Sequence, residues 1–335
     1  MNAILNPLDY PTVRMDRALL AAAGLPLVVG LAKLLAALKW NCDTTTACAK
    51  LAPGAYSGKV VWITGASSGI GREMARQLGA LGAKLILTAR EAEALEKTKA
   101  LVVAAGASAN DVVVLPGDME KLHALPALSL SAIALFGGVD VLVNNAGVTQ
   151  RETGANTAFE VDVKMANVNY LSCVCLAKSV LPTMAARGGG RIINISSIAG
   201  KVGVPLRTSY CGTKHAMIGF FDALRAEEFA RCSGVCVTNI CPGSVRTDIA
   251  RNALLGQVGS RRGETDPNIE AGLDPVWVCE RILSAASCDV DECWIATRHE
   301  LIGAYVSQYL PAYFKKIVRK RAAAAIQATL AVPSQ

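Results

Sequence analysis

The sequence predicts an α/β protein with a doubly wound sheet of about seven parallel strands and helices on both faces. Short apolar runs lack the alternation of polar and apolar residues that marks a strand with one wet face. Stretches of helical length and periodicity separate these runs. The chain has 335 residues, 52% of them hydrophobic and 18% charged, so it can bury a sizeable core and extended disorder is excluded.

The predicted strands begin at residue 59 and alternate with amphipathic helical segments. They are the runs 59–64, 84–88, 112–115, 139–145, 190–196, 235–240 and 293–296. The longest irregular stretch, 243–274, contains five glycines, and a loop of that length is typical of a lid or a binding element.

Residues 1–56 differ in composition from the rest of the chain. The segment 18–38 has 21 residues and a single charged residue, Lys33, so it is long enough to span a bilayer or to lie in one. We expect an N-terminal anchor helix there, with an Ala/Leu helix packed on the protein as the alternative. Residues 41–58 are predicted to be a polar linker, followed by the main domain at 57–300 and an amphipathic, basic extension at 301–335.

Charge and cysteine content narrow the classes of partner. The net charge is +7, and five of the basic residues lie in one short stretch, 315–321, so a nucleic-acid-binding face is not predicted. Three histidines and eleven cysteines show no metal-ligand spacing, which argues against a metal site. The stretch 301–327 sets tyrosines beside the basic cluster, which suits a membrane interface or a solvated helix end.

A glycine-rich turn lies between the first predicted strand and a helical pattern. Glycines let the backbone approach a pyrophosphate, and a helix N-terminus supplies amide groups and a positive dipole. The turn is therefore either a dinucleotide site of the Rossmann type or a tight connection that binds nothing. Its candidate cofactor residues are Gly65, Ser67, Ser68, Gly69, Ile70 and Gly71.

The next two strand ends carry one basic and one acidic candidate. Arg90 follows the second strand where an NAD-preferring site would carry a carboxylate, and a cation there suits the 2′-phosphate of NADP. Alternatively, Arg90 is a solvated charge at the start of the next helix. Asp118, after the third strand, is predicted either to accept a hydrogen bond from the adenine amino group or to cap a helix.

A second group of candidates follows the fourth and fifth strands. Asn145, Ala146 and Gly147 come directly after the fourth strand and are expected to wall the adenine and ribose side. Tyr210 and Lys214 are four residues apart and so share one helix face. A nearby ammonium stabilises a phenolate, which suits an acid/base catalyst, whereas an ordinary amphipathic pair is the alternative.

Taken in order, these motifs identify the chain as a member of the short-chain dehydrogenase/reductase family. The resemblance covers roughly residues 57–300. It rests on TGASSGIG (64–71), NNAG (144–147), Asn169 in VNYLS, Ser197 in NISS, YCGTK (210–214) and PGSVRT (242–247). Within the family, ISSIAGKVGVP, the TAR strand end and the apolar N-terminal segment are similar to the membrane-anchored group of dehydrogenase/reductase member 7 and the 11β-hydroxysteroid dehydrogenases.

The resemblance implies a role for each catalytic candidate. Tyr210 would exchange a proton with the substrate oxygen, and Ser197 would hydrogen-bond the same oxygen. Lys214 would bind the nicotinamide ribose, and Asn169 would position a water that relays the proton to solvent. The nicotinamide side would be lined by Pro242, Gly243, Val245 and Thr247.

The resulting hypothesis is an NADP(H)-dependent oxidoreductase that transfers hydride between nicotinamide and a lipophilic carbonyl or secondary alcohol, such as a steroid, a retinoid or another lipid. The alternative is a catalytically silent membrane-bound scaffold that retains the cofactor fold. By resemblance, we expect attachment to the endoplasmic reticulum membrane and a homodimer formed by the helices around 157–184 and 208–231. The sequence does not identify the substrate.

Overall fold

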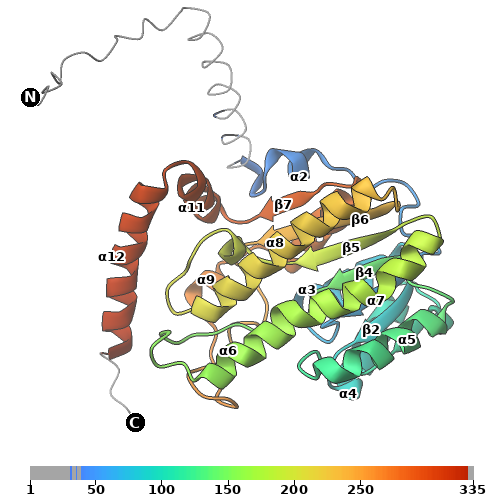
Figure 1. Ribbon diagram of the computed structural model, residues 1–335, viewed down its shortest axis with the longest axis horizontal. Helices are drawn as coiled ribbons and strands as arrows, with labels where there is room; N and C mark the ends of the chain where they lie inside the picture. The colour runs from blue at the N-terminus through green and yellow to red at the C-terminus, as the bar shows by residue number, and fades with distance from the viewer. Residues whose placement is uncertain (1–30, 32–34, 36–38, 331–335) are drawn as a thin grey trace, which may run out of the picture.

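The computed structural model describes residues 39–330, together with Leu31 and Leu35. Within these residues one sheet of seven parallel strands has the order β3-β2-β1-β4-β5-β6-β7, as Figure 1 shows. The predicted fold class is therefore confirmed. The predicted anchor at 18–38 lies outside the described residues, except for those two leucines.

The strands are short and almost completely buried in the centre of the sheet. Their bounds are β1 (Val60–Thr64), β2 (Lys84–Thr88), β3 (Val112–Val114), β4 (Val141–Asn144), β5 (Gly190–Ile195), β6 (Val235–Pro242) and β7 (Glu292–Ile295). Val61, Trp62 and Ile63 on β1 are fully buried, which explains the uninterrupted apolar runs. The strand order reverses between β1 and β4, and a doubly wound fold binds its ligand in the crevice beyond the carboxyl ends at that point.

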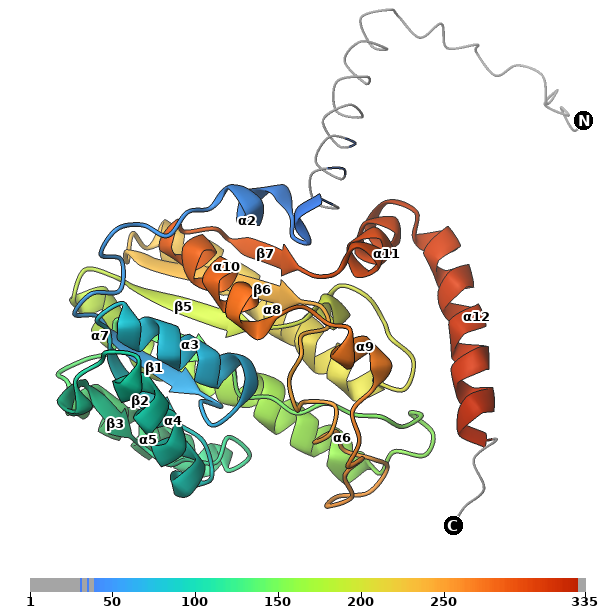
Figure 2. The same cartoon turned by 180° about the vertical axis from the view of Figure 1, so that it is seen from behind.

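Helices cover both faces of the sheet (Figures 1 and 2). One layer contains α3 (Gly69–Ala80), α4 (Ala92–Ala104) and α10 (Pro275–Ser287), and the other contains α5 (Leu125–Leu135), α7 (Ser172–Ala186) and α8 (Thr208–Ala230). Each layer encloses its own buried apolar cluster. Short 3₁₀ turns at Ala109–Asp111, Leu122–Ala124 and Ile198–Gly200 connect the larger elements.

One helix of the described residues is long and apolar enough to cross a membrane by length and composition alone. It runs from Phe159 to Ala186 and joins α6 (Phe159–Ala166), a π-helical turn at Asn167–Leu171 and α7. Its α7 part packs against β4, β5 and β6. These contacts are those of a core helix of this fold.

The predicted linker at 41–58 is instead folded against the sheet edge. Cys42 forms an antiparallel bridge with Ile295 of β7, and Asp43 caps the short helix α2 (Thr44–Cys48) while accepting a 2.6 Å hydrogen bond from the Trp294 amide. Tyr56 is 1% exposed and donates to the Leu283 carbonyl at 2.8 Å. Asn41, Cys42 and Asp43 thus satisfy the free edge of β7, which would otherwise expose unpaired backbone groups.

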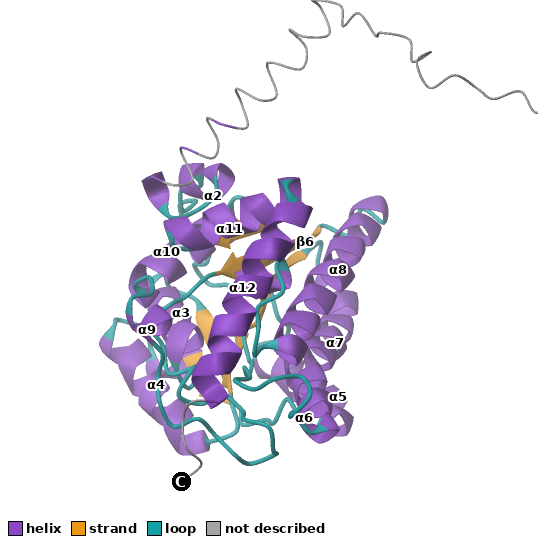
Figure 3. Ribbon diagram, turned by 90° about the vertical axis from the view of Figure 1, so that its left-hand side faces the viewer, coloured by secondary structure: helices purple, strands orange, loops and turns teal. Residues whose placement is uncertain are grey.

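Two helices follow β7. In α11 (Arg298–Tyr309), Leu301 and Ala304 are fully buried, so this helix is part of the domain body. The next helix, α12 (Pro311–Leu330), packs on α11. It runs along the side of the molecule that faces the viewer in Figure 3. The predicted basic extension is therefore helical, and its first part belongs to the core.

Candidate active site

A cavity of about 810 Å³ lies at the carboxyl ends of the strands, where the strand order reverses. It is lined by the β1–α3 turn, by the ends of β4, β5 and β6, by the start of α8 and by one side of α12. Nearly all the sequence-predicted site residues line it. The two exceptions, Gly71 and Asn169, lie behind its wall and hold other parts of it in place.

The glycine-rich turn is held in shape by Asn145. Its amide nitrogen donates to the carbonyl oxygens of Thr64 at 2.8 Å and Gly65 at 3.1 Å. Gly65 has φ of +65°, a conformation that L residues rarely adopt. A Cβ on Gly71 would lie 2.4 Å from both the Gly65 oxygen and the Asn145 amide nitrogen. Gly71 is thus required by packing, and it does not line the cavity.

The turn presents the N-terminus of α3 to the cavity. Ser67, Ser68, Gly69 and Ile70 line it, and Ser68, the N-cap residue, makes no side-chain cap hydrogen bond. The first amides of a helix lack intrahelical partners and carry a positive partial charge, so this surface fits a pyrophosphate.

Arg90 and Asp118 lie at the far end of the cavity. Arg90 is exposed and, among the described residues, forms no ion pair, so its guanidinium is available to a ligand. Asp118 lines the cavity and also accepts a 3.0 Å hydrogen bond from the Glu120 amide. The capping alternative is wrong, because the next helix begins at Leu122 with Lys121 as its N-cap, and the contact of Asp118 with the adenine stays a prediction.

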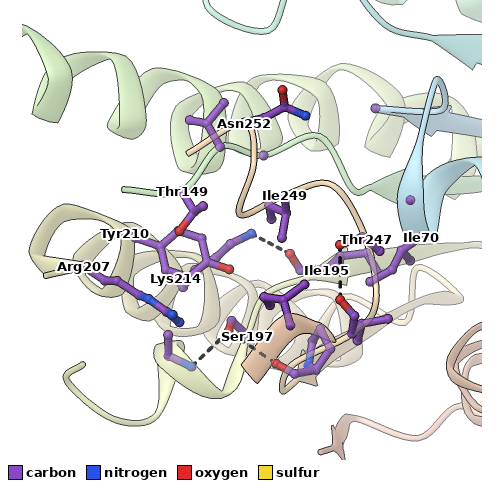
Figure 4. Close-up of a pocket in the computed structure, with 18 of the residues that line it drawn as sticks. Ile70, Thr149, Ile195, Ser197, Arg207, Tyr210, Lys214, Thr247, Ile249 and Asn252 are labelled. Carbon is purple, nitrogen blue, oxygen red and sulfur yellow. Dashed lines mark hydrogen bonds between the residues drawn. The ribbon is translucent and has the colours of Figure 1, made fainter. Parts of the chain in front are cut away.

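Ser197, Tyr210 and Lys214 converge on the cavity (Figure 4). Lys214 is 3% exposed, and its ammonium nitrogen donates to the Ile195 carbonyl at 2.7 Å and lies 5.8 Å from the centre of the Tyr210 ring. The Ser197 hydroxyl accepts from the Ala199 amide at 3.1 Å and donates to the Pro242 carbonyl at a long 3.3 Å. The serine therefore has a weakly held proton that can be redirected to a ligand.

The Lys214 ammonium is buried without a carboxylate partner in the described part of the chain. A buried charge is costly unless it is paired or hydrogen-bonded, and this ammonium uses one of its three donors. Gly147 lies next to this ammonium, since a Cβ there would be 3.7 Å from the same nitrogen. The residues present therefore fit a ligand rich in hydroxyl groups, such as the ribose of a nicotinamide cofactor.

Asn169 holds the cavity wall and does not line it. Its side-chain oxygen accepts from the Val148 amide at 2.8 Å, and its nitrogen donates to the Val148 carbonyl at 2.9 Å and to the Thr213 hydroxyl at 3.1 Å. Both amide protons are thus committed, and the residue is fully buried in the π-helical turn. The side chain of Asn169 thus ties the 147–149 segment to α8, and its expected role in positioning a water stays a prediction.

The segment after β6 is fixed by a residue that sequence reasoning missed. The Glu300 carboxylate accepts from the Ser244 amide at 2.9 Å and hydroxyl at 2.7 Å, and from the Thr297 amide and hydroxyl on its other oxygen. A Cβ on Gly243 would overlap this carboxylate. The predicted residues Pro242, Gly243, Val245 and Thr247 consequently form one wall of the cavity.

Other lining residues have no motif to reveal them. Arg151, Arg207 and Arg261 come from loops, and Phe314, Val318 and Arg321 come from α12. The one available signal was Arg207, which precedes Tyr210 by three residues and so lies near it at the start of the same helix. In the described part of the chain, no group of three or more histidine, cysteine and acidic residues is placed to hold a metal ion.

Comparison with known proteins agrees with this geometry. A family profile described as short chain dehydrogenase matches residues 59–257. The chain is 39% identical over 262 residues to Dehydrogenase/reductase SDR family member 7 of Homo sapiens, an alignment that covers 78% of this chain and 77% of that protein. The chain therefore belongs to the short-chain dehydrogenase/reductase family, as predicted, and is an oxidoreductase of that family.

Solved structures of the family hold both nicotinamide cofactors. A short chain dehydrogenase/reductase from Burkholderia phymatum in complex with NAD matches with a TM-score of 0.66 and 26% identity, over 75% of this chain and 92% of that one. A metagenomic short-chain oxidoreductase in complex with NADP matches with a TM-score of 0.58 and 30% identity, over 71% and 96%. The fold thus binds nicotinamide cofactors, and the two neighbours differ in which one.

Proposed function

We propose that the protein is an NADP(H)-dependent reductase or dehydrogenase that interconverts a lipophilic ketone and its secondary alcohol. The observation that carries this proposal is the buried Lys214 ammonium beside Tyr210 and Ser197, at the carboxyl ends of the strands. The bound nicotinamide would supply or accept the hydride. The silent-scaffold alternative has no need of this buried cation.

Each side chain of the site has its own role in the reaction. The Tyr210 hydroxyl donates its proton to the carbonyl oxygen during reduction and takes it back during oxidation. Ser197 turns its proton from the long Pro242 contact to the same oxygen and stabilises the charge that develops there. Lys214 holds the ribose and supports the phenolate with its charge. Asn169 keeps the 147–149 segment against α8, so that these groups stay aligned.

The preference for NADP(H) rests on Arg90. This residue lines the cavity two positions after β2, and its side chain is exposed. The position therefore carries a cation and not a carboxylate; the nearest carboxylate in sequence is that of Glu91, the next residue. A guanidinium can bind a 2′-phosphate with two parallel hydrogen bonds. The lipophilic class of substrate rests on the apolar side chains of the cavity, among them Ile198, Val202, Ile249 and Leu254.

A direct assay tests the proposal. Purified full-length protein is incubated with NADPH or NADH and a panel of lipophilic ketones, and cofactor oxidation is followed by absorbance. We expect turnover of at least one ketone with NADPH, at a higher kcat/KM than with NADH. Cofactor binding without turnover of any ketone, and of any alcohol in the reverse direction, would instead support the scaffold.

We also propose that segment 18–38 attaches the protein to the endoplasmic reticulum membrane. Its length, its composition and the similarity to dehydrogenase/reductase member 7 support this proposal. The basic residues of α12 that do not line the cavity, Lys315, Lys316 and Arg319 among them, suit an anionic membrane surface. The full chain should stay in the membrane pellet after extraction with alkaline carbonate, and its release would contradict an anchor.

The proposed homodimer would use α7 and α8 with their neighbours. Large apolar side chains are exposed on α6 and α8, with Phe159 74% and Phe229 86% accessible. Exposed aromatic residues of this kind are typical of an interface. Light scattering of the detergent-solubilised chain should give the mass of two protein copies, and a single-copy mass would contradict this assembly.

A further inference from the structure

The part of the cavity next to Tyr210 is strongly basic. Its loops, 148–151, 198–210 and 249–269, contribute Arg151, Arg207 and Arg261 to the lining, and α12 contributes Arg321, whereas none of the lining residues from these segments is acidic. Among the lining carboxylates, Glu300 is occupied by four donors from Ser244 and Thr297. A purely apolar ligand would offer these guanidinium groups no negatively charged partner.

A single buried carboxylate, that of Asp266, lies close to Arg151 and Arg207. Asp266 accepts from two nitrogens of Arg151 at 2.9 and 3.3 Å, and both side chains are only 9% exposed. Arg207 and Arg262 reach the same carboxylate oxygen only at 3.8 and 3.6 Å. Its other oxygen caps helix α9 (Pro267–Glu270) through the Ile269 amide. One negative charge therefore faces three positive charges.

Arg207 is the member of this group that stays available. Within the described residues its guanidinium makes only the long contact with Asp266. Figure 4 shows it pointing into the cavity beside Tyr210, on the side of Ser197. Its side chain keeps 24% exposure, so its donors face the cavity and are not sealed in the core.

The backbone before Arg207 is held in an unusual conformation. Leu206 has φ of +63°, in the left-handed region that bulky L residues rarely adopt. The Glu152 amide donates to the Leu206 carbonyl at 3.1 Å and so fixes this turn. Strain of this kind is found where surrounding structure dictates the position of a functional side chain. Here it sets the start of α8 and the direction of Arg207.

We propose that Arg207 binds an anionic group of the substrate, so that the substrate is an amphipathic carbonyl compound or alcohol with an acidic group, such as a carboxylate. This inference rests on the proposed function. The apolar lining by Val202, Ile249 and Leu254 takes the body of the molecule, while the guanidinium takes two oxygens of the acid. Arg207 is thus a specificity-determining residue, separate from the groups that move the proton.

Equilibrium binding tests the proposal without requiring turnover. Phenylbutyrate and phenylbutanol share an apolar body and differ in charge. Each is titrated by calorimetry into the full-length protein loaded with NADPH in a non-ionic detergent. Phenylbutyrate should bind about ten- to a hundredfold more tightly than the alcohol, the usual contribution of a charge-assisted hydrogen bond. Arg207→Met should remove this difference and leave the affinity for phenylbutanol within twofold.

One control variant and one further affinity measurement distinguish the ways in which the proposal could fail. Arg262→Met removes one positive charge from the same cluster at a residue that does not line the cavity, and it should keep most of the preference for the acid. Equal affinity for acid and alcohol in the unaltered protein, no binding of phenylbutyrate, or the same loss in both variants would overturn the proposal. A tenfold loss of NADPH affinity in Arg207→Met would also overturn it, by assigning the arginine to the cofactor. Failure of NADPH to bind the unaltered protein would instead refute the proposed function.

Discussion

The cofactor side and the substrate side of the cavity are built in different ways. On the cofactor side, the β1–α3 turn and the segment after β4 are contiguous motifs, held together by hydrogen bonds from the Asn145 side chain to the backbone carbonyls of Thr64 and Gly65. On the substrate side, Asp266 joins Arg151 and Arg207, residues more than fifty positions away in the chain. One side depends on backbone shape and the other on side-chain charge.

This difference indicates which half of the cavity can accept substitutions. A glycine-rich turn tolerates few substitutions because the backbone itself approaches the ligand. The substrate side can change its specificity by exchanging single side chains on loops that the sheet supports. The catalytic groups lie between the two halves, just after β5 and on α8, and should depend on both.

The largest effect is expected at this junction. Tyr210→Phe removes one hydroxyl and no packing, so turnover should fall by about 10²–10⁴-fold, the usual contribution of general acid–base catalysis. The dissociation constant for NADPH should stay within a few-fold. Steady-state kinetics and calorimetry measure the two quantities. Tyr309→Phe, on a side chain that is 78% exposed, should change neither. A variant that keeps more than about a tenth of the rate would refute Tyr210 as proton donor.

On the substrate side, Asp266→Ala should leave the buried Arg151 guanidinium without its carboxylate partner. Breaking one partner of a buried ion pair costs about 3–5 kcal/mol of unfolding free energy, and the remaining exposure of 9% favours the lower end. Denaturant unfolding measures the loss. Asp248→Ala breaks an exposed 3.9 Å pair in the same loop and should cost less than about 1 kcal/mol. Similar losses in both variants would mean that the Asp266 cluster does not hold the loop.

The same ion pair predicts a dependence on pH. Burial alone raises the pKa of the Asp266 carboxyl, but the hydrogen bond and charge of Arg151 outweigh burial and hold the pKa below its ordinary value. The stabilising contribution is therefore complete above the unfolded pKa of about 4 and is lost as the pH falls through the lower folded value. The difference in Tm between the unaltered protein and Asp266→Ala should be constant near neutral pH and shrink below about pH 4. A difference independent of pH would contradict the ion pair.

On the cofactor side, Arg90→Asp should act on cofactor choice alone. A charge-assisted contact with phosphate contributes about 1.5–3 kcal/mol, so the unaltered protein should prefer NADPH by roughly ten- to a hundredfold. The variant should lose or invert that preference, as measured by calorimetry, and keep its unfolding free energy. Lys97→Asp, an exposed site on the neighbouring helix, is the matched control. Equal affinities of the unaltered protein for NADPH and NADH would remove the basis for this proposal.

A glycine comparison tests the role of backbone shape. In Gly71→Ala the new Cβ would meet the Gly65 carbonyl oxygen and the Asn145 amide at 2.4 Å, and overpacking of this kind costs about 1–3 kcal/mol. Gly219→Ala on α8 meets nothing within 4 Å, and a helical alanine should stabilise the protein by about 0.5–1 kcal/mol. Thermal unfolding distinguishes the two. A neutral Gly71→Ala would show that the turn can shift to accept a side chain.

The sequence alone determined the sheet, the glycine-rich turn and the Ser197, Tyr210 and Lys214 group. These features depend on local patterns: apolar runs buried on both faces, glycines at a strand–helix turn, and two side chains four residues apart on one helix. Arg90 and Asp118 were found in the same way, because the end of each parallel strand lies at one edge of the sheet.

Only the tertiary structure decided the rest. Residues 41–58 look like a linker because they are polar or turn-forming, yet Cys42 and Asp43 pair with the free edge of β7 and Tyr56 packs against α10. Asn169 proved to hold a neighbouring loop, since its partners Val148 and Thr213 are remote in sequence. The cluster of Asp266 with Arg151 and Arg207 has no local signature, because the attraction between charges depends on distance in space and not on separation along the chain.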